Sequence, residues 1–252
     1  MPNESHTATF ELVNEIDADS LTLIEGLPGH GMVAAIAVDQ ITSQLNLTHH
    51  GNIISDAFPP AITFEDGLVQ DLVRVYAGSN PDVMTLKSDL ALPPVAFEPL
   101  SKCVLEDLSV EFERAVFLAG APAESEDQIG EVIGVGTTEN IKDELVSAGI
   151  QLADERGVVG GITGSLVKQC FHANVPAALL VVYSHPYLPD PEAARQVIEY
   201  NLEPLVDFDI ETNELAEQAE EIRHQMEQIA QQFQYMTEEQ QPERSPAAGM
   251  YQ

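Results

Sequence analysis

Basic residues are scarce in this chain. Among its 252 residues, 10 lysines and arginines stand against 42 aspartates and glutamates, which gives a formal net charge of −32. A protein with this charge repels nucleic acid and anionic lipid through its overall electrostatic field. The composition therefore argues against a nucleic-acid partner and against a role at a membrane surface.

Cysteine and long apolar segments are also scarce. Cys103 and Cys170 are the only cysteines and lie far apart, which excludes a disulfide framework and a zinc knuckle and predicts two buried free thiols. The start, MPNESHTATFELV, lacks a basic region followed by an apolar one, and no run approaches the ~18 apolar residues of a membrane span. We therefore expect a cytoplasmic protein with no membrane segment.

The acidic residues are spread along the whole chain instead of forming one block. This distribution is typical of a halophilic protein from a salt-rich cytosol, where screening limits repulsion between carboxylates to short range. In that setting the charge says little about partners, and we expect stability to fall when salt is diluted.

The chain does contain enough apolar sequence for a substantial core, because 44% of its residues are hydrophobic. Leu21 to Ile24 form an apolar run, three glycines interrupt it, and the apolar positions from Met32 to Leu45 then follow the helical period. This pattern predicts a strand, a glycine loop and a helix.

Strands and helices are expected to alternate along the rest of the chain. AITF and GLVQDLVRVYAG, joined by Glu65-Asp66-Gly67, predict a hairpin. Helices are expected over 93–108, after Asn140 as N-cap, after GGITG, and after Asp190 with Pro191 at the first helical position, up to a break or kink at Pro204. Further strands are expected in DVMTLKSD, ERAVFLAGAP, EVIGVGTT and PAALLVVYSHP. This order predicts an α/β layered fold with a mainly parallel mixed sheet.

A regular apolar seam follows this body. Its members alternate in steps of four and three, the a/d pattern of a coiled coil: Leu215, Ala219, Ile222, Met226, Ile229, Phe233 and Met236. Such a helix either pairs with a second copy, which we favour, or packs on its own body. We divide the chain into an α/β body (1–208), a heptad helix (209–238) and a flexible tail (239–252).

Two glycine loops are possible ligand sites. The first contains Gly26, Gly29 and Gly31; the second contains Gly160, Gly161 and Gly164. A glycine turn at a helix start can hold an anion, but the first loop reads G-x-x-G-x-G and matches neither the dinucleotide fingerprint nor a P-loop. We favour a structural role in tight turns and close packing.

No catalytic residues stand out. Ser165 lies outside a G-x-S-x-G elbow, the histidines lack the spacing of a helical metal site, and carboxylates are too abundant for any pair to be diagnostic. We predict no enzymatic activity, no cofactor and no metal.

The last three residues are the strongest functional signal. After the polar segment TEEQQPERSP, the chain ends on Met250, Tyr251 and Gln252. A flexible tether that carries an apolar side chain, a phenol and a free carboxylate fits capture of a chain end in a pocket. Several tails on one oligomer would multiply a weak affinity.

Three segments, LIEGLPGHGMVAAIAVDQI, GGITGSLVKQC and HPYLPDPEAARQVIE, together resemble the archaeal proteasome assembly chaperone family over residues 10–235. This resemblance implies a three-layer, phosphorylase/hydrolase-like α/β body without catalytic chemistry, and a homo-oligomer. It also implies a terminal hydrophobic-Tyr-X (HbYX) motif that docks between proteasome α subunits. Met250, Tyr251 and Gln252 match that motif, whereas Met32 to Ala35 depart from the glycine that many relatives carry in the helix.

Three hypotheses follow. The favoured one is an oligomeric chaperone or adaptor that binds the proteasome α ring through its tails. The alternatives are a nucleotide- or nucleoside-binding protein or enzyme that uses the glycine loops, and a structural oligomer without a proteasome role.

Overall fold

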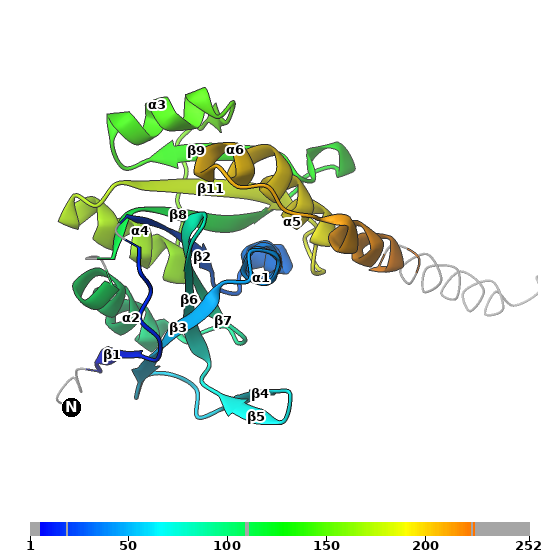
Figure 1. The fold of residues 1–252 in the computed structure, drawn as a ribbon. Helices are drawn as coiled ribbons and strands as arrows, with labels where there is room; N and C mark the ends of the chain where they lie inside the picture. Colours follow the sequence, from blue (N-terminus) through cyan, green and yellow to red (C-terminus); the bar gives the residue numbers. More distant parts are fainter. Residues whose placement is uncertain (1–5, 19, 109–110, 223, 225–252) are drawn as a thin grey trace, which may run out of the picture.

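The computed structural model describes residues 6–18, 20–108, 111–222 and 224. Its main sheet is built from β1 (Ala8–Leu12), β2 (Leu21–Gly26), β3 (Thr48–Ser55), β6 (Val73–Ser79), β7 (Asp82–Ser88), β8 (Phe112–Pro122), β9 (Val132–Gly136), β10 (Gln151–Leu152) and β11 (Ala177–Ser184). These nine strands lie in the order β1-β3-β6-β7-β2-β8-β11-β9-β10 (Figure 1).

The centre of this sheet is parallel. Strands β7, β2, β8 and β11 run in one direction, whereas β1, β3 and β6 extend the sheet as antiparallel neighbours on one side and β9 pairs antiparallel with β11 on the other. Each segment expected to form a strand contains one, although the segment after Gly67 is divided between two strands. The sequence pattern had missed β1, β3 and β10.

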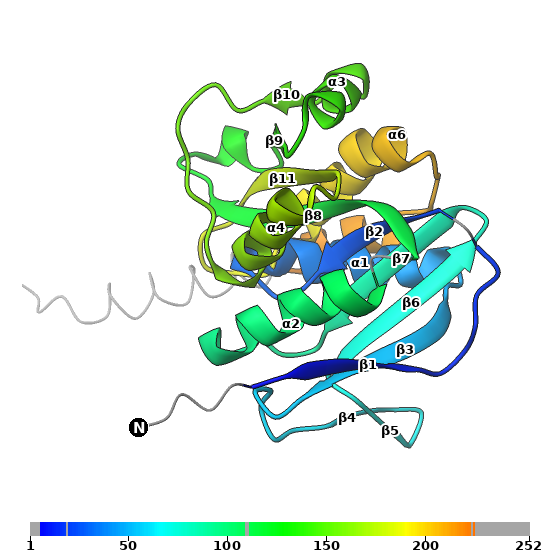
Figure 2. The ribbon, with the colours of Figure 1, turned by 90° about the vertical axis from the view of Figure 1, so that its left-hand side faces the viewer.

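Helices cover both faces of the sheet (Figure 2). On one face, α2 (Phe97–Cys103) and α4 (Gly161–Ala173) bury side chains such as Leu100 and Leu166 against the strands. On the other face lie α1 (Val33–Gln44), α3 (Glu139–Ser147), α5 (Pro191–Val197) and α6 (Glu203–Val206), which bury side chains such as Ile41, Leu145 and Val197. The predicted three-layer α/β architecture is confirmed.

The predicted hairpin is also confirmed. Strands β4 (Thr63–Glu65) and β5 (Leu68–Gln70) are joined by Asp66 and Gly67, both with positive φ, as a tight hairpin turn requires. The single long strand expected after Gly67 was wrong, because the chain leaves the hairpin and enters the main sheet only at β6.

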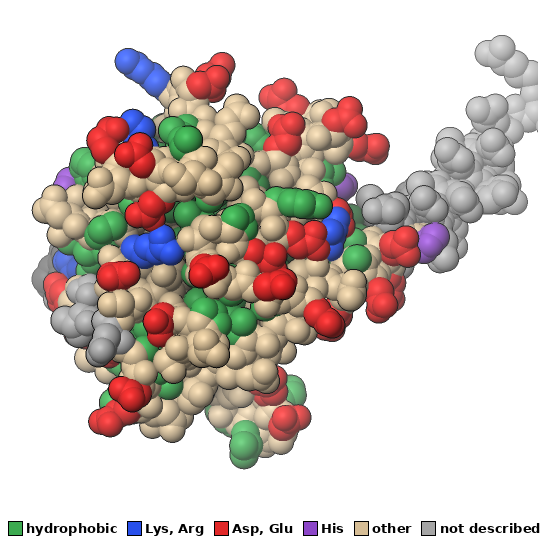
Figure 3. Space-filling model, turned by 45° about the horizontal axis from the view of Figure 1, so that its top comes forward, with side chains coloured by type: hydrophobic (Ala, Val, Ile, Leu, Met, Phe, Trp, Pro, Cys, Tyr) green, Lys and Arg blue, Asp and Glu red, His purple; other side chains and the backbone are tan. Residues whose placement is uncertain are grey.

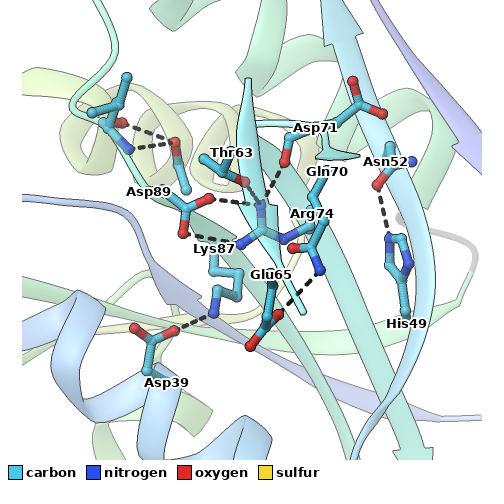
Figure 4. A network of polar contacts seen from close by, with 12 residues as sticks. Asp39, His49, Asn52, Thr63, Glu65, Gln70, Asp71, Arg74, Lys87 and Asp89 are labelled. Atoms are coloured by element: carbon cyan, nitrogen blue, oxygen red, sulfur yellow. Dashed lines mark hydrogen bonds and ion pairs between the residues drawn. The ribbon is translucent and has the colours of Figure 1, made fainter. Parts of the chain in front are cut away.

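A buried arginine ties the base of this hairpin to the main sheet (Figure 4). Arg74 donates from Nη1 to the Thr63 hydroxyl at 3.0 Å and forms a two-pronged ion pair with Asp89 at 2.6 and 3.0 Å. Because Arg74 is buried, these bonds fix where the hairpin leaves the body. The hairpin itself is largely apolar and exposed, through Phe64, Leu68 and Val69.

The N-caps of α5 and α3 test the two capping predictions. Asp190 caps α5 as predicted: its Oδ1 accepts from the Ala193 N–H at 3.0 Å, and Pro191 follows at the first helical position. The predicted N-cap at Asn140 was wrong. Thr138 caps α3 instead, because its hydroxyl accepts from the Ile141 N–H at 3.3 Å.

The other predicted helices are present, but 3₁₀ and π turns interrupt the regular α-helical geometry of some of them. The segment predicted as a helix over 93–108 is helical, with a short 3₁₀ turn before α2 and a π turn after it. The helical run that starts at Pro191 does not end at Pro204. It passes through a second π turn over Ile198–Leu202 into α6 and ends after Val206.

The predicted heptad helix begins on the body. Residues 213–222 are helical, and the first two seam members, Leu215 and Ala219, are buried. Leu215 belongs to the same core cluster as residues of α1 and α5. Met226, Ile229 and Phe233 of the seam, and the predicted tail, lie outside the described residues. In the part of the chain that the structure describes, no helix has the length and apolarity to cross a membrane.

Candidate functional site

The two glycine loops lie next to each other. The first loop follows β2, and the second opens α4, whose first turn contains Thr163. The Thr163 hydroxyl lies 3.4 Å from both carboxyl oxygens of Glu25, near the end of β2. The carboxyl ends of parallel strands are the usual ligand edge of an α/β sheet.

Glu25 is the most unusual group at this edge. It is fully buried, and its Oε1 accepts a hydrogen bond from the Leu27 N–H at 3.2 Å, inside the first loop. Burial raises the pKa of Glu25 from 4.5 to about 8, against smaller lowering effects from its hydrogen bonds. At neutral pH this carboxyl is therefore mostly protonated and acts as a structural hydrogen-bonding group.

Close packing explains three of the predicted loop glycines: Gly26, Gly31 and Gly164, where an added Cβ would lie 2.4 Å from the Val159 carbonyl oxygen. A Cβ added to Gly26 would lie 2.3 Å from the Val38 Cβ, so glycine here lets α1 pack directly on β2. Gly31 has φ of +62°, and a Cβ there would lie 2.3 Å from the Ser184 hydroxyl at the end of β11. By contrast, a Cβ on Gly29 or Gly160 would meet nothing within 4 Å.

The first loop is also held by hydrogen bonds to the start of α5. The Asp190 N–H donates to the Gly31 carbonyl at 2.9 Å, and the Asp190 Oδ2 accepts from the His185 N–H at 2.7 Å. Asp190 therefore joins three segments: the first glycine loop, the exit from β11, and the first turn of α5. These contacts support a structural role for Gly31.

An apolar groove lies beside this junction. Its volume is about 840 Å³, and it is lined by the segment after β8, the segment after β11, the first turn of α5 and the helical residues 213–222. Ala219 and Ile222 of the predicted seam form part of its wall. The sequence did not predict this groove, because four separate segments build it.

The other chemically interesting side chains have structural surroundings. Ser165 accepts a hydrogen bond from the Ser101 hydroxyl at 2.8 Å and donates to the Phe97 carbonyl, so no base activates it. Cys103 and Cys170 are buried free thiols, as predicted, and burial raises the pKa of each to about 12. Among the described residues, no three potential metal-binding side chains cluster. The predicted docking residues Met250, Tyr251 and Gln252 lie outside the described part of the chain.

Comparison with known proteins places this chain in a family. Residues 23–230 match the model of the PAC2 family. An uncharacterized protein from Methanocaldococcus jannaschii is 28% identical over 219 residues, which cover 86% of this chain and 89% of that protein.

Solved structures agree with this match. Pyrococcus furiosus PbaA, an archaeal homolog of proteasome-assembly chaperone, superposes with a TM-score of 0.79 at 25% identity, covering 92% of this chain and 95% of PbaA. Pyrococcus furiosus PbaB, an archaeal proteasome activator, gives a TM-score of 0.79 at 19% identity, over 89% of this chain and 99% of PbaB. The family match spans most of the sequence, and we conclude that this chain belongs to the PAC2 family, together with archaeal homologues of proteasome-assembly chaperones.

Proposed function

We propose that this protein is a proteasome assembly chaperone or adaptor whose C-terminal tails bind the α ring of the archaeal core proteasome. The observation that carries the proposal is the pairing of a PAC2 body with a chain end that reads Met250-Tyr251-Gln252. The structural similarity to PbaA, an archaeal homolog of proteasome-assembly chaperone, supports a proteasome-related role, and PbaB, an archaeal proteasome activator, shares the fold.

The chemistry of the tail explains how it would bind. Met250 fills an apolar pocket, the Tyr251 ring packs beside it while its hydroxyl finds a hydrogen-bond partner, and the terminal carboxylate of Gln252 meets a lysine or a set of backbone N–H groups. One such contact is weak. A homo-oligomer that presents several tails to a ring of matching pockets gains roughly 10²–10⁴ in affinity through effective concentration.

A capture experiment tests this proposal. The full chain and a variant that lacks Met250 to Gln252 are immobilised and exposed to assembled α rings in high salt. We expect capture by the full chain and little by the truncated one. A variant that lacks Ala247 and Ala248 but keeps the final three residues is the matched control and should capture normally.

Two outcomes contradict the proposal. Equal capture by the full and truncated chains would remove the tail from the mechanism. A strictly monomeric protein in molar salt, measured by light scattering, would remove the multivalency on which the affinity depends.

A further inference from the structure

The groove beside α5 has an apolar floor. Ile129, Leu188 and Pro189 come from the segments after β8 and β11, and Ile222 faces them from the helical residues 213–222. The volume of about 840 Å³ lies within the ~300–1,000 Å³ that are typical of binding pockets. Leu215, about two helical turns before Ile222, is buried in the core and holds the start of this helical segment against the body.

The rim of the groove carries carboxylates without a cationic partner. Glu124 and Glu126 are exposed in the segment after β8, and neither forms an ion pair with any residue that the structure describes. Glu192, on the opposite side, differs because it pairs with Arg195 at 2.6 Å. Arg195 also binds Glu199 at 2.7 Å, so it is not available to Glu124 or Glu126.

We propose that this groove binds a basic, aliphatic peptide segment of a protein partner. In an extended peptide, side chains alternate between two sides. Aliphatic side chains would rest on Ile129, Leu188 and Ile222, while lysine or arginine side chains between them would reach Glu124 and Glu126. Ion pairs at contact distance survive strong screening, because the Debye length at about 1 M salt is still ~3 Å.

The groove lies beside the helical residues 213–222, which precede the tail in the sequence. A partner held by Met250 to Gln252 would therefore have a second contact on the body. That link to the proteasome rests on the proposed function, whereas peptide binding in the groove does not.

Fluorescence anisotropy with a synthetic probe tests the groove directly. The probe is a short labelled peptide in which leucine alternates with lysine, measured with the full chain in about 1 M KCl, where only short-range charge contacts persist. We expect saturable binding. A matched peptide with glutamate in place of lysine, and one with glycine in place of leucine, should each bind at least ~10-fold more weakly, which corresponds to about 1.4 kcal/mol.

Protein variants locate the site. Glu124→Gln with Glu126→Gln should weaken probe binding several-fold, and Leu188→Ser should weaken it further. Glu15→Gln with Asp17→Asn removes two exposed charges from the segment that enters β2 at its opposite end, so this control should bind like the parent. Equal binding by all of these variants, or equal binding of the lysine and glutamate peptides, would overturn the proposal.

The same assay separates this proposal from that for the tail. A chain that lacks Met250 to Gln252 should bind the probe unchanged. Melting temperatures of the variants confirm that each is folded. Because the glutamine substitutions are isosteric and lie on the surface, they test the charge contact even if Leu188→Ser destabilises the chain.

Discussion

Glu25 is a carboxyl group placed where water cannot reach it. It lies on the central strand β2, and its hydrogen bonds to the Leu27 N–H and the Thr163 hydroxyl join the two glycine loops. Burying an ionised carboxylate is costly, so the group keeps its proton well into the neutral range. The same residue therefore holds the loops in place and makes stability depend on pH.

Replacing Glu25 with glutamine should remove this dependence. In the unfolded chain the carboxyl ionises near 4.5, whereas in the folded chain it does so only near pH 8. Its contribution to stability is therefore complete below about pH 4.5 and is lost as the pH rises to 8, by an amount on the order of a few kcal/mol. Glu25→Gln stays neutral and keeps an acceptor, so the variant should become relatively more stable as the pH rises.

Thermal melts of parent and variant across this pH range, at constant high salt, measure the effect. The quantity of interest is the difference between the two melting curves, because other carboxylates titrate in both proteins. Glu11→Gln, on the exposed edge strand β1, is the control and should leave the pH profile unchanged. Parallel profiles for parent and Glu25→Gln would contradict the assignment.

Asp190 offers a graded test at a helix start. Both carboxylate oxygens accept backbone N–H groups, from Ala193 and from His185. Asparagine keeps one acceptor and alanine keeps none, so Asp190→Asn should cost less than Asp190→Ala, for which we expect about 2 kcal/mol. Urea unfolding midpoints measure this series. An alanine variant with the midpoint of the parent would show that these bonds do not stabilise the fold.

At the scale of elements, sequence patterns predicted the parts whose signals are local. The unit β2, glycine loop and α1 was predicted because an apolar run, glycines and a helical period follow one another directly. The start of α5 was predicted because Asp190 and Pro191 form a capping signal within two residues. In both cases the deciding interactions lie close together in the chain.

The missed strand β3 shows why other elements could not be predicted. Its sequence, THHGNIIS, contains two histidines and a glycine and does not look apolar. Gly51 is needed because the Phe10 ring would lie 2.4 Å from an added Cβ. His50 can be buried in this strand because both of its ring nitrogens have partners, the Asn14 carbonyl at 2.8 Å and the Glu111 carboxylate at 2.6 Å. These partners are distant in sequence, so no local pattern reveals them.

Only part of the candidate site was predicted from the sequence. The glycine loops were found from their composition, but Glu25 was not, although an acid at the end of an apolar strand just before a glycine loop is a signal that could have been used. The groove was not found either. Its floor joins Ile129, Leu188 and Ile222 from segments that meet only in the folded protein.

Gly26 and Gly29 form a matched pair that separates packing from ligand binding. Gly26→Ala forces a Cβ against Val38 and should destabilise the contact between β2 and α1 by about 1–3 kcal/mol. Gly29→Ala meets open space and should change stability by no more than ~0.5 kcal/mol. Denaturant unfolding of both variants measures these changes in stability.

A thermal-shift screen with nucleotides and phosphate, on the parent and on Gly29→Val, tests the alternative that the first glycine loop binds a ligand. A ligand that raises the melting temperature of the parent but not of Gly29→Val would favour that alternative.

At the scale of the whole molecule, repulsion between carboxylates dominates the charge balance. Acidic side chains are spread over the face shown in Figure 3, with few basic side chains among them. Six of the 10 basic residues are already in ion pairs with carboxylates: Arg74, Lys87, Lys102, Arg114, Lys142 and Arg195. With 42 acidic residues against 10 basic ones, most carboxylates must be screened by mobile cations instead of by side chains of this protein.

We therefore expect the melting temperature to rise strongly with KCl. The Debye length falls from ~10 Å at 0.1 M to ~3 Å at 1 M, which confines repulsion to neighbouring carboxylates in the folded state. Sucrose provides the control because it stabilises through exclusion from the protein surface without screening charge. At equal osmolality, KCl should raise the melting temperature more than sucrose does. Equal effects of the two would mean that exclusion alone stabilises the protein, and a melting temperature independent of KCl would contradict the salt-rich setting inferred from the composition.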